Sequence, residues 1–317
     1  MRANTEGQIK AMSDLRPQAK RGDAPSFLAR LRGDPVAFAS LLFIVVTVVL
    51  AAIGPAIYEG LAADMKQYRT YDYQDYANIN SWPSAVHWLG ADALGRDTFT
   101  RLLLGLRVSL GVAAFVQIIN VGLGASLGLM AGNYGGVIDF VVSRVADMLF
   151  AFPGLLLAIL VSAVFGPAAQ DFAGDIGRLL LVSGALALVS WPLMARYVRA
   201  QTLSLKERDF VLAARSIGAG ERRIMVTHIL PNVTGLIITA ATLDVSGVVL
   251  SEAVLSLLGL GIQTPGSSLG IMITQAIPAL HNNPFQVFVP GAMLTMLVLS
   301  FSFLGDGIRD ALDPQTR

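Results

Sequence analysis

The sequence contains no cysteine, few histidines and few charged residues. Among its 317 residues there are three histidines, and 14% of the chain is charged. The lack of cysteine excludes disulfides, thiolate metal sites and a cysteine nucleophile. The histidines His87, His228 and His281 stand far apart, and none has a carboxylate at metal-ligand spacing. We therefore expect each histidine to be structural, and we expect no metal site and no cofactor.

A phosphate-binding motif is also missing. No Gly-x-x-x-x-Gly-Lys-Ser/Thr sequence occurs, which predicts that this chain does not bind or hydrolyse ATP. The net charge of +1 gives no indication of a nucleic-acid partner. A membrane enzyme would need a nucleophile with a base, or a metal-binding cluster, and the sequence indicates neither.

Hydrophobic residues, by contrast, dominate the chain. They make up 54% of it, and the mean hydropathy of +0.61 is far above that of a soluble domain. Six stretches approach the ~20 residues that cross the hydrocarbon core of a bilayer. They are Val36–Ile57, Val108–Ala131, Val141–Phe165, Leu179–Val198, Val233–Leu258 and Val287–Leu304. The sequence predicts an all-α bundle of six transmembrane helices whose apolar surface contacts membrane lipid.

The basic residues predict the orientation of this bundle. Residues 1–34 and residues 196–223 each hold seven Lys or Arg, whereas residues 166–177 and 260–289 hold none. Basic loops stay on the cytoplasmic side of a bacterial-type inner membrane. We therefore expect both termini and the 196–223 region to be cytoplasmic, which an even number of spans allows.

The amino-terminal region predicts a tail followed by a retained anchor. Residues 1–34 are interpreted as a cytoplasmic tail and residues 35–317 as one membrane domain of six spans. Within the tail we expect disorder over 1–25 and a short amphipathic helix over Phe27–Arg32. The first apolar run is too long and too far from the start for an ordinary signal peptide. Residues 58–107 are expected to form an extracytoplasmic segment rich in Tyr and Trp. These aromatic residues have three alternative roles: a packed cap, anchors at the membrane interface, or a docking surface for a solute-binding protein.

A polar, basic helix-loop-helix over residues 204–231 interrupts the hydrophobic spans. Ser204 and Glu207 have the spacing of a capping box, and Gly218 is suited to end the first helix. The second helix is expected from Glu221 to about Ile229, ending at Leu230-Pro231. The segment predicts a compact element that contacts a partner outside the membrane. Its expected contact residues are Phe210, Ala213, Ala214, Ile217, Gly218, Ile224, Met225, Leu230 and Pro231.

This segment resembles the Glu-Ala-Ala loop of the membrane subunits of ABC importers. The match consists of Leu212-Ala213-Ala214, Gly218 and Leu230-Pro231, with Leu212 where the family has Glu. The resemblance implies that residues 204–231 couple the chain to a cytoplasmic ATPase. An amphipathic connector lying on the membrane surface is the alternative.

A second motif is similar to the signature of C-type permease subunits of dipeptide, oligopeptide and nickel ABC importers. It is His87-Trp-Leu-Gly-Ala-Asp-Ala-Leu-Gly-Arg-Asp97 followed by Arg101-Leu-Leu-Leu-Gly-Leu-Arg-Val-Ser-Leu110, with Ala91 in place of Thr. Further matches extend the resemblance over about residues 85–314, although Thr264–Gly270 departs from the family pattern and lacks its Trp.

The resemblance implies a type I ABC importer permease fold and the partners of such an importer. These are a homologous permease subunit in a heterodimer, two cytoplasmic ATPase subunits and an extracytoplasmic substrate-binding protein. Peptides are the first expectation for the solute, and the chain would form half of the pathway. A self-sufficient secondary transporter is the alternative, although it would show an inverted repeat that we do not find.

Two acidic residues fall within the predicted fifth span. Asp244 and Glu252 are eight residues apart, which places them ~80° apart around a helix and ~12 Å apart along it. Both can face the bundle interior, where a carboxylate needs hydrogen bonds, neutralisation or water. Glu252 is interpreted as a partner of hydroxyl or backbone groups on a neighbouring span. For Asp244, a water-lined pathway and a buried network remain equal alternatives.

Three glycines form a ridge of small residues in the predicted second span. Gly124, Gly128 and Gly132 recur every four residues, a spacing that permits a second helix to approach closely. We expect this ridge to be a seam of the bundle, and a flexing point in transport is the alternative.

Overall fold

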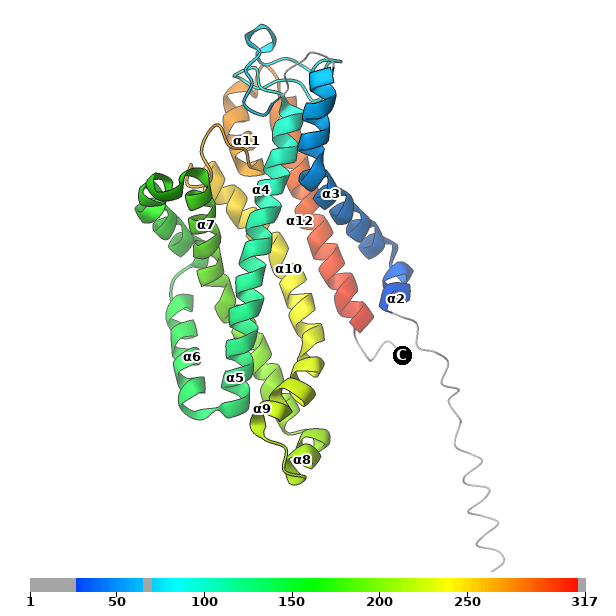
Figure 1. The fold of residues 1–317 in the computed structure, drawn as a ribbon, viewed down its shortest axis with the longest axis vertical. Coiled ribbons are helices and arrows are strands. Elements are labelled where there is room, and N and C mark those ends of the chain that lie inside the picture. Colours follow the sequence, from blue (N-terminus) through cyan, green and yellow to red (C-terminus); the bar gives the residue numbers. More distant parts are fainter. Residues whose placement is uncertain (1–26, 65–69, 313–317) are drawn as a thin grey trace, which may run out of the picture.

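The computed structural model describes residues 27–64 and 70–312. Within these ranges the regular structure is entirely helical, and the only β pairing is an isolated bridge between Ala91 and Asp97. The helices form an elongated bundle, with residues 70–97 as a cap at one end and α8 and α9 at the other (Figure 1). The all-α prediction is therefore confirmed for the described chain.

The helices follow one another with few breaks. Before the cap lie α2 (Phe27–Gly33) and α3 (Pro35–Asp64), and the cap holds the short η1 (Tyr76–Asn78). The next group is α4 (Thr98–Ile119), the π-helical η2 (Asn120–Ala125), α5 (Ser126–Tyr134), α6 (Gly136–Phe150) and α7 (Gly154–Lys206). The remainder is α8 (Asp209–Ser216), α9 (Glu221–Arg223), the π-helical η3 (Ile224–Ile229), α10 (Leu230–Leu257), α11 (Leu269–Ala276), η4 (Ile277–Ala279) and α12 (Phe285–Leu312).

Five helical stretches of the described chain are long and apolar enough to cross a membrane. They are Pro35–Leu61, Thr98–Tyr134, Gly154–Lys206, Glu221–Leu257 and Phe285–Leu312. The predicted first, second, fifth and sixth apolar spans lie on four of these stretches, with the fifth running one residue past Leu257.

The predicted third span is wrong as a single continuous helix. The range Val141–Phe165 is interrupted between the end of α6 at Phe150 and the start of α7 at Gly154. Pro153 lies directly before α7, and a proline disfavours helical backbone in the residue before it. Hydropathy does not register this break, because Ala151 and Phe152 continue the apolar run.

Helix α7 contains two helical segments. At 53 residues it would be ~80 Å long if straight. Ala173 and Gly174 have non-helical backbone angles, and the chain turns there near the cap (Figure 1). The predicted fourth span, Leu179–Val198, lies in the second segment, which continues to Lys206.

The glycine ridge is a bundle seam, as predicted. A Cβ on Gly124 would lie 2.8 Å from the Trp191 carbonyl oxygen, and one on Gly128 would lie 2.5 Å from that of Ala195. At Gly132 a Cβ would lie 2.7 Å from Cβ of Thr202. The helix from α4 to α5 therefore packs against α7 at backbone contact, which only glycine permits.

One part of the amino-terminal prediction, its short helix, is confirmed. The expected helix over Phe27–Arg32 is α2, and Arg30 Nη1 donates a hydrogen bond of 3.1 Å to the Ala311 carbonyl at the end of α12. The predicted disorder of residues 1–25 lies outside the described residues.

Candidate functional site

The polar segment at the end opposite the cap begins later than predicted. Helix α7 continues through Ser204 to Lys206, and α8 starts only at Asp209, so the capping-box prediction at Ser204 and Glu207 is wrong. The reason is packing. Thr202 and Leu205 are buried, and their packing keeps the last turns of α7 helical. This packing outweighs the tendency of Ser204 and Glu207 to cap the start of a new helix.

The predicted helix end at Gly218 is confirmed. Gly218 has a φ of +85°, which side chains other than glycine rarely adopt. Its N–H donates to the Arg215 carbonyl at 3.0 Å, and the Ala219 N–H donates to the Ala214 carbonyl at 3.1 Å. These two bonds form a Schellman motif and reverse the chain after α8.

The second helix of the segment does not end at Pro231, contrary to the prediction. Helix α10 starts at Leu230, and the π-helical turn Ile224–Ile229 joins α9 to it without a break. A proline removes one backbone donor and collides with the carbonyl four residues earlier, so a local widening of the helix accommodates Pro231.

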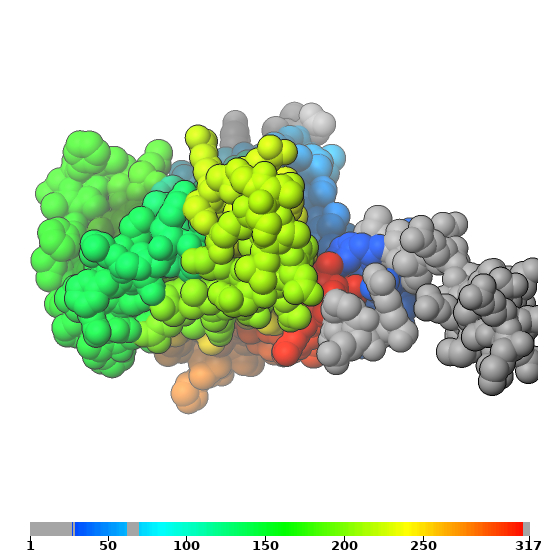
Figure 2. All heavy atoms as spheres, turned by 90° about the horizontal axis from the view of Figure 1, so that it is seen from below, coloured from blue at the N-terminus to red at the C-terminus, as the bar shows by residue number. Residues whose placement is uncertain are grey.

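The expected contact residues divide into an exposed face and a buried face. Phe210, Ala213, Ile217, Gly218 and Pro231 are exposed, with Ile217 at 88%. Met225 and Leu230 are half-buried, while Ala214 and Ile224 are buried in the protein's own core. The exposed face of α8 lies at the extreme end of the molecule, where the yellow-green atoms of this segment project in Figure 2.

The buried face anchors the segment to three long helices. Val211 and Ile224 are fully buried in a cluster with Leu129 of α5, Val198 of α7 and Val233 of α10. Because these contacts are close-packed, a displacement of α8 would displace α7 and α10 with it.

Polar contacts strengthen this anchor. Glu221 forms an ion pair with Arg215 at 3.0 Å and accepts a hydrogen bond from the Asn133 amide at 3.3 Å. Lys206 Nζ donates to the Asn133 carbonyl at 2.7 Å. The end of α5 is therefore tied to both halves of the segment.

Asp244 of α10 faces α4. Its Oδ2 accepts a bond of 2.6 Å from the Gln117 amide and one of 2.9 Å from the Asn120 amide. No basic side chain among the described residues forms an ion pair with Asp244. Both of these donors are amides, so the carboxylate lies in a neutral hydrogen-bond network.

Glu252 is enclosed where α4, α10 and α11 meet. It is 2% exposed, and its carboxylate accepts bonds of 2.7 Å from the Ser109 and Ser256 hydroxyls. Ser268, which caps α11, donates in turn to the Ser256 hydroxyl at 3.1 Å. The predicted bond from Glu252 to a hydroxyl on a neighbouring span is therefore present, in the form of Ser109.

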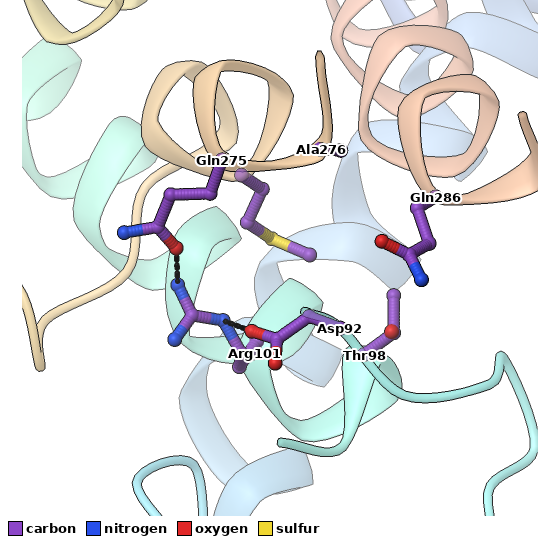
Figure 3. A pocket seen from close by; sticks show the side chains of 7 residues that line it. Asp92, Thr98, Arg101, Gln275, Ala276 and Gln286 are labelled. Carbon is purple, nitrogen blue, oxygen red and sulfur yellow. Dashed lines mark hydrogen bonds and ion pairs between the residues drawn. The ribbon is translucent and has the colours of Figure 1, made fainter. Parts of the chain in front are cut away.

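The cap is held to the bundle by two buried arginines. Arg96 and Arg101 each donate to Gln275 Oε1 of α11, at 2.9 and 2.8 Å, and both lie beside the Asp92 carboxylate. Figure 3 shows Arg101 between Asp92 and Gln275 beneath α11. Asp92, Arg96 and Arg101 belong to the 87–110 signature, which therefore supplies one side of the joint between cap and bundle.

The pairing of His87 was missed by the sequence interpretation. Its Nδ1 lies 2.8 Å from Asp97 Oδ2, and its Nε2 lies 3.6 Å from Asp75 Oδ2. The hydrogen bond with Asp97 raises the pKa of His87 above its ordinary value. Asp97 also caps α4 by accepting the Thr100 N–H. The ten-residue spacing of His87 and Asp97 within the signature was the available signal.

The spacing Gly-x-Ser-x-Gly, which is typical of serine hydrolases, occurs twice, at Gly124–Gly128 and at Gly266–Gly270. The first lies in the helix from α4 to α5, and Ser268 of the second caps α11. Neither is on a strand-to-helix turn, so neither is a nucleophile elbow. The described residues also contain no group of three potential metal ligands.

Comparison with known proteins identifies the family. Residues 124–317 match the family model described as binding-protein-dependent transport system inner membrane component. The chain is 38% identical to the glutathione transport system permease protein GsiD of Escherichia coli O6:K15:H31 (strain 536 / UPEC), over 98% of this chain and 97% of that protein. It is 36% identical to GsiD of Pectobacterium atrosepticum over 98% of each chain.

Solved structures show the same fold at lower identity. An amino acid ABC transporter crystallised with histidines matches with a TM-score of 0.52 and 20% identity, over 68% of this chain and 95% of that one. The MetNI methionine ABC transporter in an inward-facing conformation matches with a TM-score of 0.52 and 19% identity, over 68% and 98%. The chain therefore belongs to the binding-protein-dependent transport system inner membrane components, as a multi-pass permease subunit of an ABC importer in which partner subunits hydrolyse ATP.

Proposed function

We propose that this chain forms half of the translocation pathway of a small-peptide importer and couples to its ATPase through residues 204–231. The complete importer would hold a homologous permease in a heterodimer, two cytoplasmic ATPase subunits and an extracytoplasmic substrate-binding protein. The observation that carries this proposal is the two-sided coupling segment. It presents Phe210, Ala213 and Ile217 outward while its other face is packed into α5, α7 and α10.

This geometry suits the transmission of force. An ATPase that closes on ATP would push against the exposed face of α8 and, through the close-packed face, rotate or tilt α7 and α10. Asp244 lies on α10, and its bonds to Gln117 and Asn120 join α10 to α4 and η2 in the middle of the bundle. In the proposed cycle this junction is where the pathway opens and closes.

We further propose six membrane crossings with both termini in the cytoplasm. The two segments of α7 would cross separately, the first together with α6, and the cap and the turn at Ala173-Gly174 would lie outside. The fourteen basic residues of 1–34 and 196–223 support this orientation.

The proposed solute is a small peptide such as glutathione. Support comes from the relatives, which are named for glutathione transport and are similar along nearly their whole length. The solute is most directly identified by purifying the binding protein of this system and measuring which peptides it binds.

The coupling role is tested by a pair of substitutions at one exposed position. Ala213→Arg places a large charge on the outer face of α8, whereas Ala213→Ser preserves its shape. In the reconstituted complex, Ala213→Arg is expected to lower substrate-stimulated ATP hydrolysis and transport about tenfold or more, as a charge buried without a partner at an interface would. Ala213→Ser is expected to behave as wild type. Normal coupling in Ala213→Arg would refute the docking assignment.

Single cysteines test the orientation in this cysteine-free chain. Ser204 and Asn282 are exposed and lie at opposite ends of the bundle. Ser267 also lies on the cap side, but its side chain is only 3% exposed and is too buried for labelling. Ser204→Cys is expected to react with an impermeant thiol reagent from the cytoplasm and Asn282→Cys from outside. Reaction of both from one side would overturn the topology.

A further inference from the structure

An apolar groove runs along one side of the bundle and reaches Gln117, the residue that donates to Asp244. It has a volume of about 500 Å³ and is lined by α3, α4, α10 and α12. Val48, Ala52, Gly111, Ala114 and Phe301 form its apolar walls. Figure 1 shows α3 beside α4 near the cap and diverging from it toward α2.

One end of the groove carries a cation without an acidic partner. Arg107 of α4 is exposed, and its Nη2 donates a bond of 3.0 Å to the Ala52 carbonyl of α3. Among the described residues no carboxylate lies within ion-pair distance of Arg107. Because a guanidinium has five N–H donors, Arg107 can bind an anion that the described chain does not supply.

The position of Arg107 corresponds to the headgroup side of a membrane leaflet. Ala52 lies five residues before Ile57, the cap-side end of the first apolar run, which is ~8 Å along a helix. Arg107 itself lies one residue before Val108, where the second predicted apolar run begins, and this also places it at the cap-side boundary. From Arg107 the groove continues to Gln117, ten residues or ~15 Å further into the bundle, which is about half of a ~30 Å hydrocarbon core.

We infer that this groove binds a phospholipid of the cap-side leaflet. Arg107 would hold the phosphate, and one acyl chain would lie along α4 toward Gln117. The groove has a cation at one end and is about as long as one leaflet is thick, and both properties fit a phospholipid.

The walls disfavour the other occupants. Arg107 and Gln117 are the only lining residues with polar side chains, so a peptide in the groove would leave most of its backbone groups unpaired. A helix of the partner permease would be ~10 Å wide. An acyl chain has no polar groups and a smaller cross-section.

The test uses the assembled importer in lipid bilayers containing phosphatidylglycerol with a photoreactive diazirine midway along one acyl chain. Adducts are mapped by mass spectrometry. We expect them on residues 44–52 of α3 and 110–117 of α4.

Two variants with matched controls make the test specific. Gly111→Leu fills the groove, since a Cβ there meets nothing within 4 Å, and it is expected to reduce these adducts about tenfold, equivalent to ~1.4 kcal/mol of lost affinity. Gly247→Leu, equally unobstructed but outside the groove lining, is expected to leave them unchanged. Arg107→Gln is expected to reduce them, and Arg144→Gln, at an exposed arginine outside the groove, is not.

Three results would overturn the inference. One is the absence of adducts on these stretches, or adducts that Gly111→Leu leaves intact. Another is a cross-link from Gly111→Cys to the partner permease, which would place a protein surface in the groove. The last is rapid reaction of Gly111→Cys with a charged, impermeant thiol reagent, which would make the groove aqueous.

Discussion

The Gln117 side chain of α4 donates a hydrogen bond of 2.6 Å to Asp244 of α10. Asn120 donates to the same oxygen, so one carboxylate oxygen joins α10 to the end of α4. Since a single acceptor oxygen receives both bonds, an asparagine at position 244 can accept both without the charge.

Two substitutions at Asp244 therefore distinguish the effect of its charge from the effect of its hydrogen bonds. Asp244→Asn is expected to leave the thermal stability of the purified complex close to wild type. Asp244→Leu removes the acceptor, leaves two amides unpaired and is expected to cost about 1–3 kcal/mol. If Asp244 lines the pathway, Asp244→Asn changes the transport rate per assembled complex or its pH dependence. Loss of stability in Asp244→Asn with normal transport would assign the residue to packing alone.

Glu252 and Ser109 are expected to depend on each other energetically. Glu252→Ala leaves two buried hydroxyls without their acceptor, at a cost of about 1–3 kcal/mol. A double-mutant cycle with Ser109→Ala, read from denaturation of the purified complex, is expected to give a coupling of at least ~0.5 kcal/mol. Additive effects would show that the Ser109 bond contributes little.

The seam between α5 and α7 predicts a position-specific glycine effect. Gly128→Ala forces a Cβ against the Ala195 carbonyl and is expected to destabilise the complex by about 1–3 kcal/mol. Gly122→Ala serves as control, because a Cβ there meets nothing within 4 Å and alanine favours a helix. Equal stability of the two variants would contradict the close packing described for Gly128.

The cap is expected to weaken at alkaline pH. The pKa of His87 is raised from its ordinary value of 6.5 because its ring is hydrogen-bonded to Asp97. A raised folded-state pKa contributes stability that is complete below 6.5 and is lost as the pH rises through the folded value. The melting temperature of the wild type is therefore expected to fall more between about pH 6 and about pH 9 than that of His87→Gln. Parallel curves would contradict the pairing.

Asp75 acts in the opposite pH range. Its pKa is lowered, first because the Asn78 amide donates to it, so its contribution is present above its ordinary pKa and is lost in acid. Asp75 itself does not titrate in the alkaline range, although its carboxylate contributes to the raised pKa of His87.

The sequence predicted the helical class, most spans and the role of Gly218, because these depend on composition and local backbone preference. It failed where burial outweighed local chemistry. Ser204 and Glu207 have capping-box spacing, yet the packing of Thr202 and Leu205 carries α7 past them. Pro231 was expected to end a helix, but the π turn of η3 accommodates it.

The sequence also could not predict which side chains become hydrogen-bond partners when the helices pack together. Hydropathy found Asp244 and Glu252, but only the packing of α4 against α10 shows that Gln117 and Ser109 are their partners. Ala213 and Ala214 were both expected to contact the partner, whereas the structure exposes the first and buries the second. Family membership decided what the sequence left open between an ABC importer and a secondary transporter.

The central claim, that the exposed face of α8 contacts the ATPase, is tested most directly by cross-linking from Ile217. Ile217→Cys would be the only cysteine of the chain and lies at an 88% exposed position. In the complex assembled with its ATPase subunits, a short thiol cross-linker is expected to join this position to the ATPase. Phe172→Cys, 91% exposed on α7 near the cap, is expected to give no such product. An intact complex in which Ile217→Cys gives no ATPase adduct, or in which Phe172→Cys gives the same one, would contradict the account.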